Sequence, residues 1–157
     1  MNTYEIDAIM TRTPVYRGTF SCDEMPGDFK GLMIVNTDPH YAPGTHWIAI
    51  FVDCTGHRGE FFDSFGRPPN EHFSNYMNNH CSNWIYNNRQ LQSIASKYCG
   101  YYCVVYCLLR SLGRDMYSIC RNFTRDTGYN DALIKKCLRF IVSNGHFRNK
   151  AYVRFIR

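Results

Sequence analysis

The stretch that decides the fold is Gly100–Leu109, which reads Gly-Tyr-Tyr-Cys-Val-Val-Tyr-Cys-Leu-Leu and contains no charged residue. A run that is apolar on every side is typical of a buried strand or of a helix buried all round, and periodicity alone does not separate the two. The closing leucines and Arg110 are good helix formers, and a helix that begins here places Cys99 where catalysis can use it. We therefore expect a buried central helix directly after Cys99.

Outward from this run, the preceding part of the chain alternates short strands with turns. β-branched and aromatic segments bounded by Gly, Pro and Asp predict strands at Gly31–Asn36, His46–Val52, Glu60–Phe62 and Asn83–Tyr86. Helical patterns occupy Tyr4–Met10, Asn70–Asn79 and Ala132–Ser143, the last with a C-cap at Asn144-Gly145. Arg17–Lys30 and Asn87–Gln92 are expected to be loops. This order predicts one α+β domain over residues 1–157.

The composition is that of a single globular unit, because 45% of the 157 residues are hydrophobic and only 20% are charged. The chain contains no apolar stretch of about 18 residues that would span a bilayer, and its start lacks the basic end and apolar middle of a signal peptide. We expect an intracellular, unsecreted protein whose eight cysteines are mostly reduced.

Charge is distributed unevenly along the chain. The net charge is +5, and no acidic residue follows Asp131. Seven basic residues do follow it: Lys135, Lys136, Arg139, Arg148, Lys150, Arg154 and Arg157. This asymmetry is typical of a solvated basic face or of a surface that meets a polyanion, and both interpretations stay open.

Four residues supply the groups that nucleophilic cysteine catalysis requires. Cys99 lies at the start of the expected buried helix, where the positive end of the helix dipole favours its thiolate. His46 opens one strand and Asp63 ends its neighbour, so the acid would orient the imidazole that acts as base. Gln92 precedes Cys99 by seven positions, and its amide would hold the oxyanion together with the backbone amide of Cys99.

The neighbours of these residues carry further expectations. Trp47 would shield the His46 imidazole from water, and Gly100 would let a substrate backbone approach the thiol. Asp53 rivals Asp63, but it closes the strand that His46 opens, and about 20 Å separates the ends of such a strand. The remaining histidines fall in loops or polar segments: His40, His57, His72, His80 and His146.

The motifs Gly44-Thr45-His46-Trp47, Phe62-Asp63-Ser64-Phe65-Gly66 and Cys99-Gly100, with Gln92 before the last, resemble the adenovirus protease family. The resemblance covers Val15–Leu109 and includes Gly18-Thr19-Phe20, Pro26-Gly27 and Ile34-Val35-Asn36-Thr37. It implies a mixed sheet flanked by helices and a monomeric endopeptidase that cleaves viral capsid and core precursors, often at glycine-containing sites. It also implies a location in virions and infected cells, in the host nucleus. Asp63 stands where the adenovirus enzymes usually carry Glu, and the region after the central helix is shorter.

The same resemblance implies two activators. Adenovirus proteases are activated by DNA and by a viral peptide joined to the enzyme through a disulfide. The cysteine that takes the peptide lies eleven positions before the oxyanion Gln, as Cys81 lies eleven before Gln92. An activating peptide at Cys81 and stimulation by DNA are therefore hypotheses, and a purely structural thiol at Cys81 is the alternative.

Three other functions remain as alternatives. SUMO- or ubiquitin-specific isopeptidases use the same residue types, but they usually carry Gln six positions before Cys and an acid directly before it, where this chain has Ser93 and Tyr98. A zinc module would use Cys99, Cys103 and Cys107, which one helix spreads over about 12 Å, too far for one ion, so no metal is expected. A non-enzymatic DNA-binding protein would need a recognisable nucleic-acid motif beside the scattered basic residues.

Overall fold

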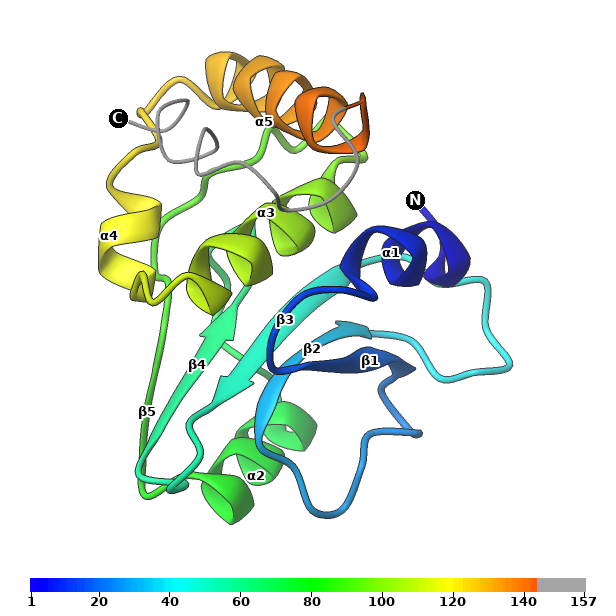
Figure 1. Ribbon diagram of the computed structural model, residues 1–157, viewed down its shortest axis with the longest axis vertical. Helices are drawn as coiled ribbons and strands as arrows, with labels where there is room; N and C mark the ends of the chain where they lie inside the picture. Colours follow the sequence, from blue (N-terminus) through cyan, green and yellow to red (C-terminus); the bar gives the residue numbers. More distant parts are fainter. Residues whose placement is uncertain (144–157) are drawn as a thin grey trace.

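The apolar run forms the central helix of the computed structural model, which describes residues 1–143 (Figure 1). This helix is α3 (Cys99–Ser111). The other elements, in chain order, are α1 (Thr3–Met10), β1 (Tyr16–Ser21), β2 (Gly31–Asn36), β3 (Trp47–Val52), β4 (Arg58–Phe62), α2 (Glu71–His80), β5 (Asn83–Tyr86), α4 (Met116–Cys120) and α5 (Thr127–Ser143). The expected C-cap at Asn144-Gly145 and the basic residues from Arg148 onward lie outside the described residues.

The five strands form one mixed sheet whose spatial order follows the chain, β1-β2-β3-β4-β5. β2, β3 and β4 pair antiparallel, whereas the outer strands β1 and β5 pair parallel to their neighbours. Helix α2 connects β4 to β5, as a parallel pair requires a crossover. The α+β fold class with a mixed sheet flanked by helices is confirmed.

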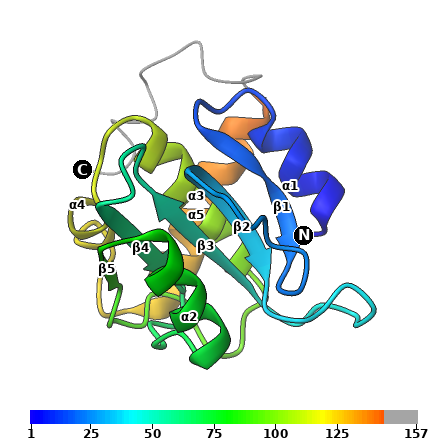
Figure 2. The ribbon, with the colours of Figure 1, turned by 90° about the horizontal axis from the view of Figure 1, so that it is seen from below.

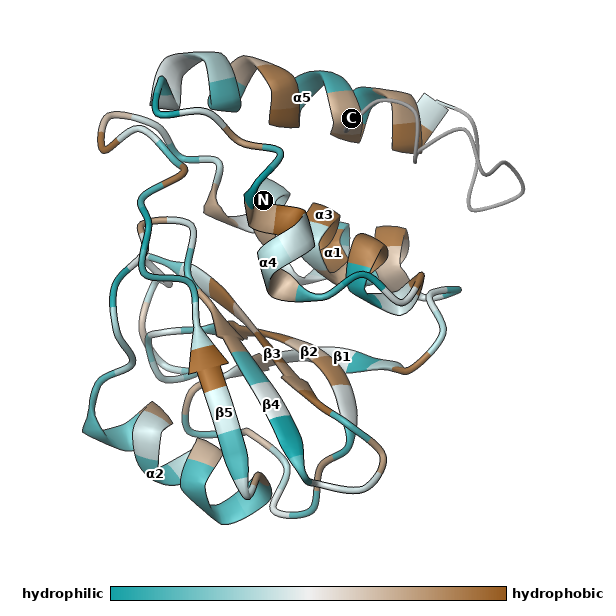
Figure 3. Cartoon of the chain, turned by 90° about the vertical axis from the view of Figure 1, so that its left-hand side faces the viewer, coloured by the Kyte–Doolittle hydropathy of each residue, from teal (hydrophilic) through white to brown (hydrophobic). Residues whose placement is uncertain are grey.

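Helices cover both faces of the sheet. Figure 2 shows α2 on one face, where it packs near β4 and β5, with α1 and α3 on the other. Figure 3 shows α5 lying beyond α3, so that α3 is enclosed between the sheet and a further helix. This position explains why α3 is apolar on almost every side, since ten of its residues are buried.

A buried polar group fixes the far end of α3 to the sheet. The Glu60 carboxylate of β4 accepts hydrogen bonds from the Tyr106 hydroxyl and from Arg110 Nε, the latter at 3.2 Å. The Tyr106 ring stacks on Phe62 with 4.5 Å between centroids. Because these contacts fix α3 along β4, they also determine where its first residue, Cys99, lies relative to the sheet.

Two elements were not expected from the sequence. The segment Arg17–Lys30 was predicted to be a loop, but its first part belongs to the edge strand β1. Gly18 sits at a register shift with φ of 141°, and the strand is only partly buried, so the alternation typical of a strand is absent. The short helix α4 is capped by Asp115, whose side chain accepts from the Ser118 amide. None of the described helices is long and apolar enough to cross a bilayer.

Candidate active site

The four predicted catalytic residues come from four segments that meet at the start of α3. Cys99 is the first residue of the helix, His46 directly precedes β3, and Asp63 directly follows β4. Gln92 lies in the connection between β5 and α3. Cys99, His46 and Gln92 line one cavity of about 450 Å³, and Asp63 lies behind His46.

Strand register brings the acid to the base. Ala49 of β3 pairs with Phe62 of β4, so the next residue, Asp63, falls close to the start of β3 and to His46. The His46 Nε2 and the Asp63 Oδ1 are 2.7 Å apart, and the two side chains are 14% and 5% exposed. With Nε2 engaged by the acid, Nδ1 is the imidazole nitrogen left for the thiol.

The hydrogen bond between His46 and Cys99 shifts both groups toward an ion pair. Burial by itself lowers the pKa of His46, but the bonds to Asp63 and Cys99 outweigh it and raise the pKa from 6.5 to about 9. Burial by itself raises the pKa of Cys99, but the imidazole and the backbone amides of Trp47 and Gly100 outweigh it and lower the pKa. Both shifts favour a thiolate beside an imidazolium over a neutral thiol beside a neutral imidazole.

The start of α3 adds a further source of positive potential. Within the described residues no side chain caps the helix, because Tyr98 occupies the N-cap position without a side-chain hydrogen bond. No capping oxygen therefore competes for the first amides of α3, of which that of Gly100 bonds the Cys99 sulfur, and the helix dipole adds to the positive potential there. This agrees with the place that the sequence predicted for the nucleophile.

Gln92 is fully buried and bound at both ends of its side-chain amide. The Ser64 hydroxyl donates to Gln92 Oε1 at 2.6 Å, and Gln92 Nε2 donates to the Ser96 carbonyl at 2.9 Å. An amide nitrogen carries two protons, so one remains for a second acceptor. The oxyanion role of Gln92 stays a prediction that this geometry permits.

The structure shows contacts beside His46 and Gly100 that the sequence did not predict. The ring beside the His46 imidazole is Phe65, with centroids 5.0 Å apart, whereas the Trp47 indole donates to the Met1 carbonyl at 3.1 Å. A Cβ on Gly100 would lie 3.2 Å from the Met1 side chain and 3.3 Å from the Trp47 ring. Gly100 thus lets Met1 and Trp47 pack closely against the start of α3, and Met1 lines the cavity.

Sequence reasoning also missed the residues that hold the acid and the amide in place. Asn87 was placed in a polar loop, but its buried side chain bonds the backbone of Asp63. Ser64 was quoted only as part of a motif, but it is fully buried and orients Gln92. Ser64 could have been singled out because it lies next to Asp63 within the motif Phe62-Asp63-Ser64-Phe65-Gly66. Nothing in the sequence near Asn87 indicated that it bonds Asp63.

The rival and accessory candidates lie elsewhere. Asp53 closes a turn by accepting from the Thr55 hydroxyl and the His57 amide, each at 3.0 Å. Cys81 is 6% exposed, burial raises the pKa of its thiol, and a Cβ on Gly59 would collide with its sulfur. Among residues 1–143, no group of His, Cys, Asp and Glu is arranged to hold a metal ion.

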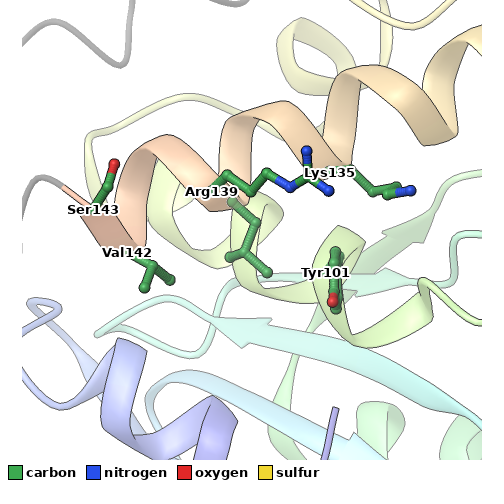
Figure 4. A pocket seen from close by; sticks show the side chains of 6 residues that line it. Tyr101, Lys135, Arg139, Val142 and Ser143 are labelled. Carbon is green, nitrogen blue, oxygen red and sulfur yellow. The ribbon is translucent and has the colours of Figure 1, made fainter.

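A second cavity, of about 460 Å³, lies between α3 and α5 and contains none of the predicted catalytic residues. Figure 4 shows Lys135 and Arg139 extending from α5 near Tyr101 of α3. Val142 forms part of its apolar wall. The cavity therefore belongs to the helical layer and not to the site around Cys99.

The fold is similar to that of a cysteine protease. The solved structure in question is the selenomethionine form of the ASFV pS273R protease, which matches with a TM-score of 0.51 and 20% sequence identity over 73% of this chain. The match covers only 59% of the ASFV protein. No protein-family model and no curated protein matches the sequence. At this identity the similarity concerns the fold, and it leaves the adenovirus-protease family itself unconfirmed.

Proposed function

We propose that this chain is a cysteine endopeptidase that cleaves viral structural precursor proteins during particle maturation. The observation that carries the proposal is the meeting of Cys99, His46 and Gln92 around one cavity, with Asp63 bound to the far side of the imidazole. The lowered pKa of Cys99 and the raised pKa of His46 are those of an activated thiol and its base.

In the proposed reaction the Cys99 thiolate attacks the carbonyl carbon of a peptide bond. The charge that develops on the carbonyl oxygen is held by the Gln92 amide and the Cys99 backbone amide. The imidazolium of His46 gives its Nδ1 proton to the leaving amine, and a thioester remains on Cys99. Water then attacks the thioester while His46 takes its proton, and the Cys99 sulfur leaves as a thiolate, which releases the acid product and restores the thiolate–imidazolium pair.

The viral part of the proposal has two supports. The motifs around His46, Asp63 and Cys99 resemble those of adenovirus proteases, and the fold is similar to that of the ASFV pS273R protease. From the same supports we infer viral precursor polypeptides as substrates, and a site of action inside virions and infected cells, including the host nucleus.

Thiol reactivity at low pH tests the assignment of the nucleophile. Exposure alone predicts that Cys54, which is exposed, reacts before Cys99, which is 8% exposed. The lowered pKa of Cys99 predicts the reverse order at pH 6. Brief treatment with iodoacetamide followed by peptide mapping measures the order, and unmodified Cys99 beside modified Cys54 would contradict the proposal. Cys54→Ala serves as the control that keeps activity.

Cleavage mapping tests the reaction and its substrate class. The wild-type chain should create new N-termini in a library of viral structural polypeptides, while the Cys99→Ala and His46→Ala variants should create none. The isopeptidase alternative predicts instead that ubiquitin or SUMO probes label Cys99 and that linear polypeptides stay intact. Cleavage by Cys99→Ala would refute the assignment of the nucleophile.

Activation by a peptide at Cys81 and by DNA completes the proposal. Because Cys81 is buried, a disulfide there requires its sulfur to reach the surface, so mass spectrometry of unreduced enzyme from particles is the decisive measurement. Full activity of the isolated chain with no adduct would exclude the peptide.

For DNA, the described basic residues on α5 include Lys135 and Arg139, and their replacement by Gln should remove any stimulation of activity by DNA at low salt.

A further inference from the structure

We propose that Asn87 and Ser64 are positioning residues that set the acid and the oxyanion donor through a single dipeptide, Asp63-Ser64. The inference deepens the proposed function and rests on it. The side chain of Asp63 faces the base, while the side chain of Ser64 faces the amide of Gln92. Two adjacent residues thus bind the proposed base, His46, and the proposed oxyanion donor, Gln92.

Asn87 holds this dipeptide from the next segment of the chain. Its Oδ1 accepts from the Asp63 backbone amide at 2.8 Å, and its Nδ2 donates to the Asp63 carbonyl at 2.6 Å. The pair of bonds fixes both the position and the rotation of the Asp63 backbone, from which the carboxylate projects to His46. Since Asn87 is buried, water offers poor replacement for either bond.

Ser64 makes three bonds to the segment that contains Gln92, two of them to Gln92 itself and one to Leu91. The hydroxyl of Ser64 donates to Gln92 Oε1 at 2.6 Å, while its carbonyl accepts from the backbone amides of Leu91 at 2.9 Å and of Gln92 at 3.0 Å. The Ser96 carbonyl, which can only accept, fixes the orientation of the amide by taking a hydrogen bond from Nε2 at 2.9 Å, and the Ser64 hydroxyl holds that orientation by donating to Oε1. A donor for the oxyanion requires that orientation.

The two segments are packed closely enough to move together. Gly66 closes the turn after Ser64 with φ of 69° and donates to the Asp63 carbonyl at 2.8 Å. A Cβ on Gly66 would collide with the backbone of Arg89. The turn at 63–66 and the segment at 87–92 therefore support each other, with the Asn87 bonds holding the acid and the Ser64 bonds holding the amide.

Substitution of each residue separates a positioning role from a merely structural one. Asn87→Ala should weaken the hold of Asp63 on His46 and lower the rate of Cys99 alkylation at pH 6 by about three- to tenfold, the effect of one neutral hydrogen bond. Ser64→Ala should leave that alkylation unchanged. It should lower kcat by roughly 10- to 100-fold at constant KM, and weaken binding of a peptide aldehyde to the same degree, because only the adduct has the oxyanion.

The control is Asn122→Ala, which removes two side-chain bonds to backbone carbonyls, of Ser118 and Ile119, at the end of α4. It should lower stability to urea as the Asn87 variant does and leave alkylation and kcat unchanged. If Asn87→Ala fails to fold, Asn87→Asp keeps the volume and the acceptor but loses the donor to the Asp63 carbonyl, and alkylation of that variant is measured instead.

The outcomes decide the two proposals separately. If the wild-type chain cleaves no polypeptide, the proposed function fails. Alkylation of Cys99 needs no substrate, so it still tests whether Asn87 positions Asp63. An Asn87 variant that is less stable but alkylates at the wild-type rate would overturn the role of Asn87. A Ser64→Ala enzyme with wild-type kcat and aldehyde affinity would overturn the role of Ser64.

Discussion

Replacing Asp63 by Asn removes the charge from the triad while keeping its shape. The Asp63 Oδ1 accepts from His46 Nε2 at 2.7 Å and from the Phe65 amide at 2.9 Å, and an Asn oxygen can keep both bonds. What is lost is the charge-assisted part of the bond to the imidazolium. The pKa of His46 should therefore fall from about 9 toward its ordinary value of 6.5.

The size of the effect follows from that shift. The full rise from 6.5 to about 9 corresponds to about 3 kcal/mol at 1.36 kcal/mol per pKa unit, and Cys99 shares in it. A hydrogen bond to a charged group contributes about 1.5 to 3 kcal/mol, so kcat/KM at pH 8 should fall roughly 10- to 100-fold. The imidazolium of His46 persists below its pKa in the folded protein and is lost above it. The alkaline limb of the wild-type profile of kcat/KM against pH should therefore lie near pH 9.

The assay is the pH dependence of kcat/KM and of Cys99 alkylation for the wild type and the variant. The alkaline limb of Asp63→Asn should move to lower pH, while the Asp53→Asn control, changed at the far end of β3, should keep the wild-type profile. Identical limbs for Asp63→Asn and the wild type would mean that Asp63 does not set the charge of His46, and the triad assignment would fail.

Three further predictions concern the wall of the cavity, the amide and the core. Gln92→Ala should lower kcat by about 100-fold or more with KM changed less than about twofold, measured on a cleaved peptide; a change in KM alone would contradict the oxyanion role. Phe62→Ala should reduce the free energy of unfolding, measured in urea, by about 3 to 5 kcal/mol, because Phe62 is 1% exposed and stacks on Tyr106. A reduction below about 1 kcal/mol would disprove that packing. Gly100→Ala should change the free energy of unfolding by less than about 1 kcal/mol, because the higher helix propensity of Ala offsets the tight contact of its Cβ with Met1. The variant should still lower kcat/KM, because Met1 lines the cavity and must shift, and unchanged kinetics would show that Met1 does not shape the site.

The sequence was enough to predict the central helix and the approximate ends of the strands that carry His46 and Asp63. The apolar run after Cys99 indicated a helix buried all round, and α3 begins at Cys99 itself. The strand patterns placed His46 and Asp63 at the ends of neighbouring strands, and the register of β3 and β4 brings them to 2.7 Å. The strand ends follow from turn residues next to apolar runs, and the helix followed from the helix-forming residues at the end of its apolar run and from the place that it gives Cys99.

Contacts between distant segments were decided only by the tertiary structure. The edge strand β1 has no clear alternation, so its pairing with β2 depends on the neighbouring strand and not on its own residues. The bonds of Asn87 to Asp63 link positions 24 residues apart, and that of Ser64 to Gln92 links positions 28 apart. A buried amide has the same composition whichever backbone it bonds, so its partner is fixed by the packing of turns against one another and not by spacing.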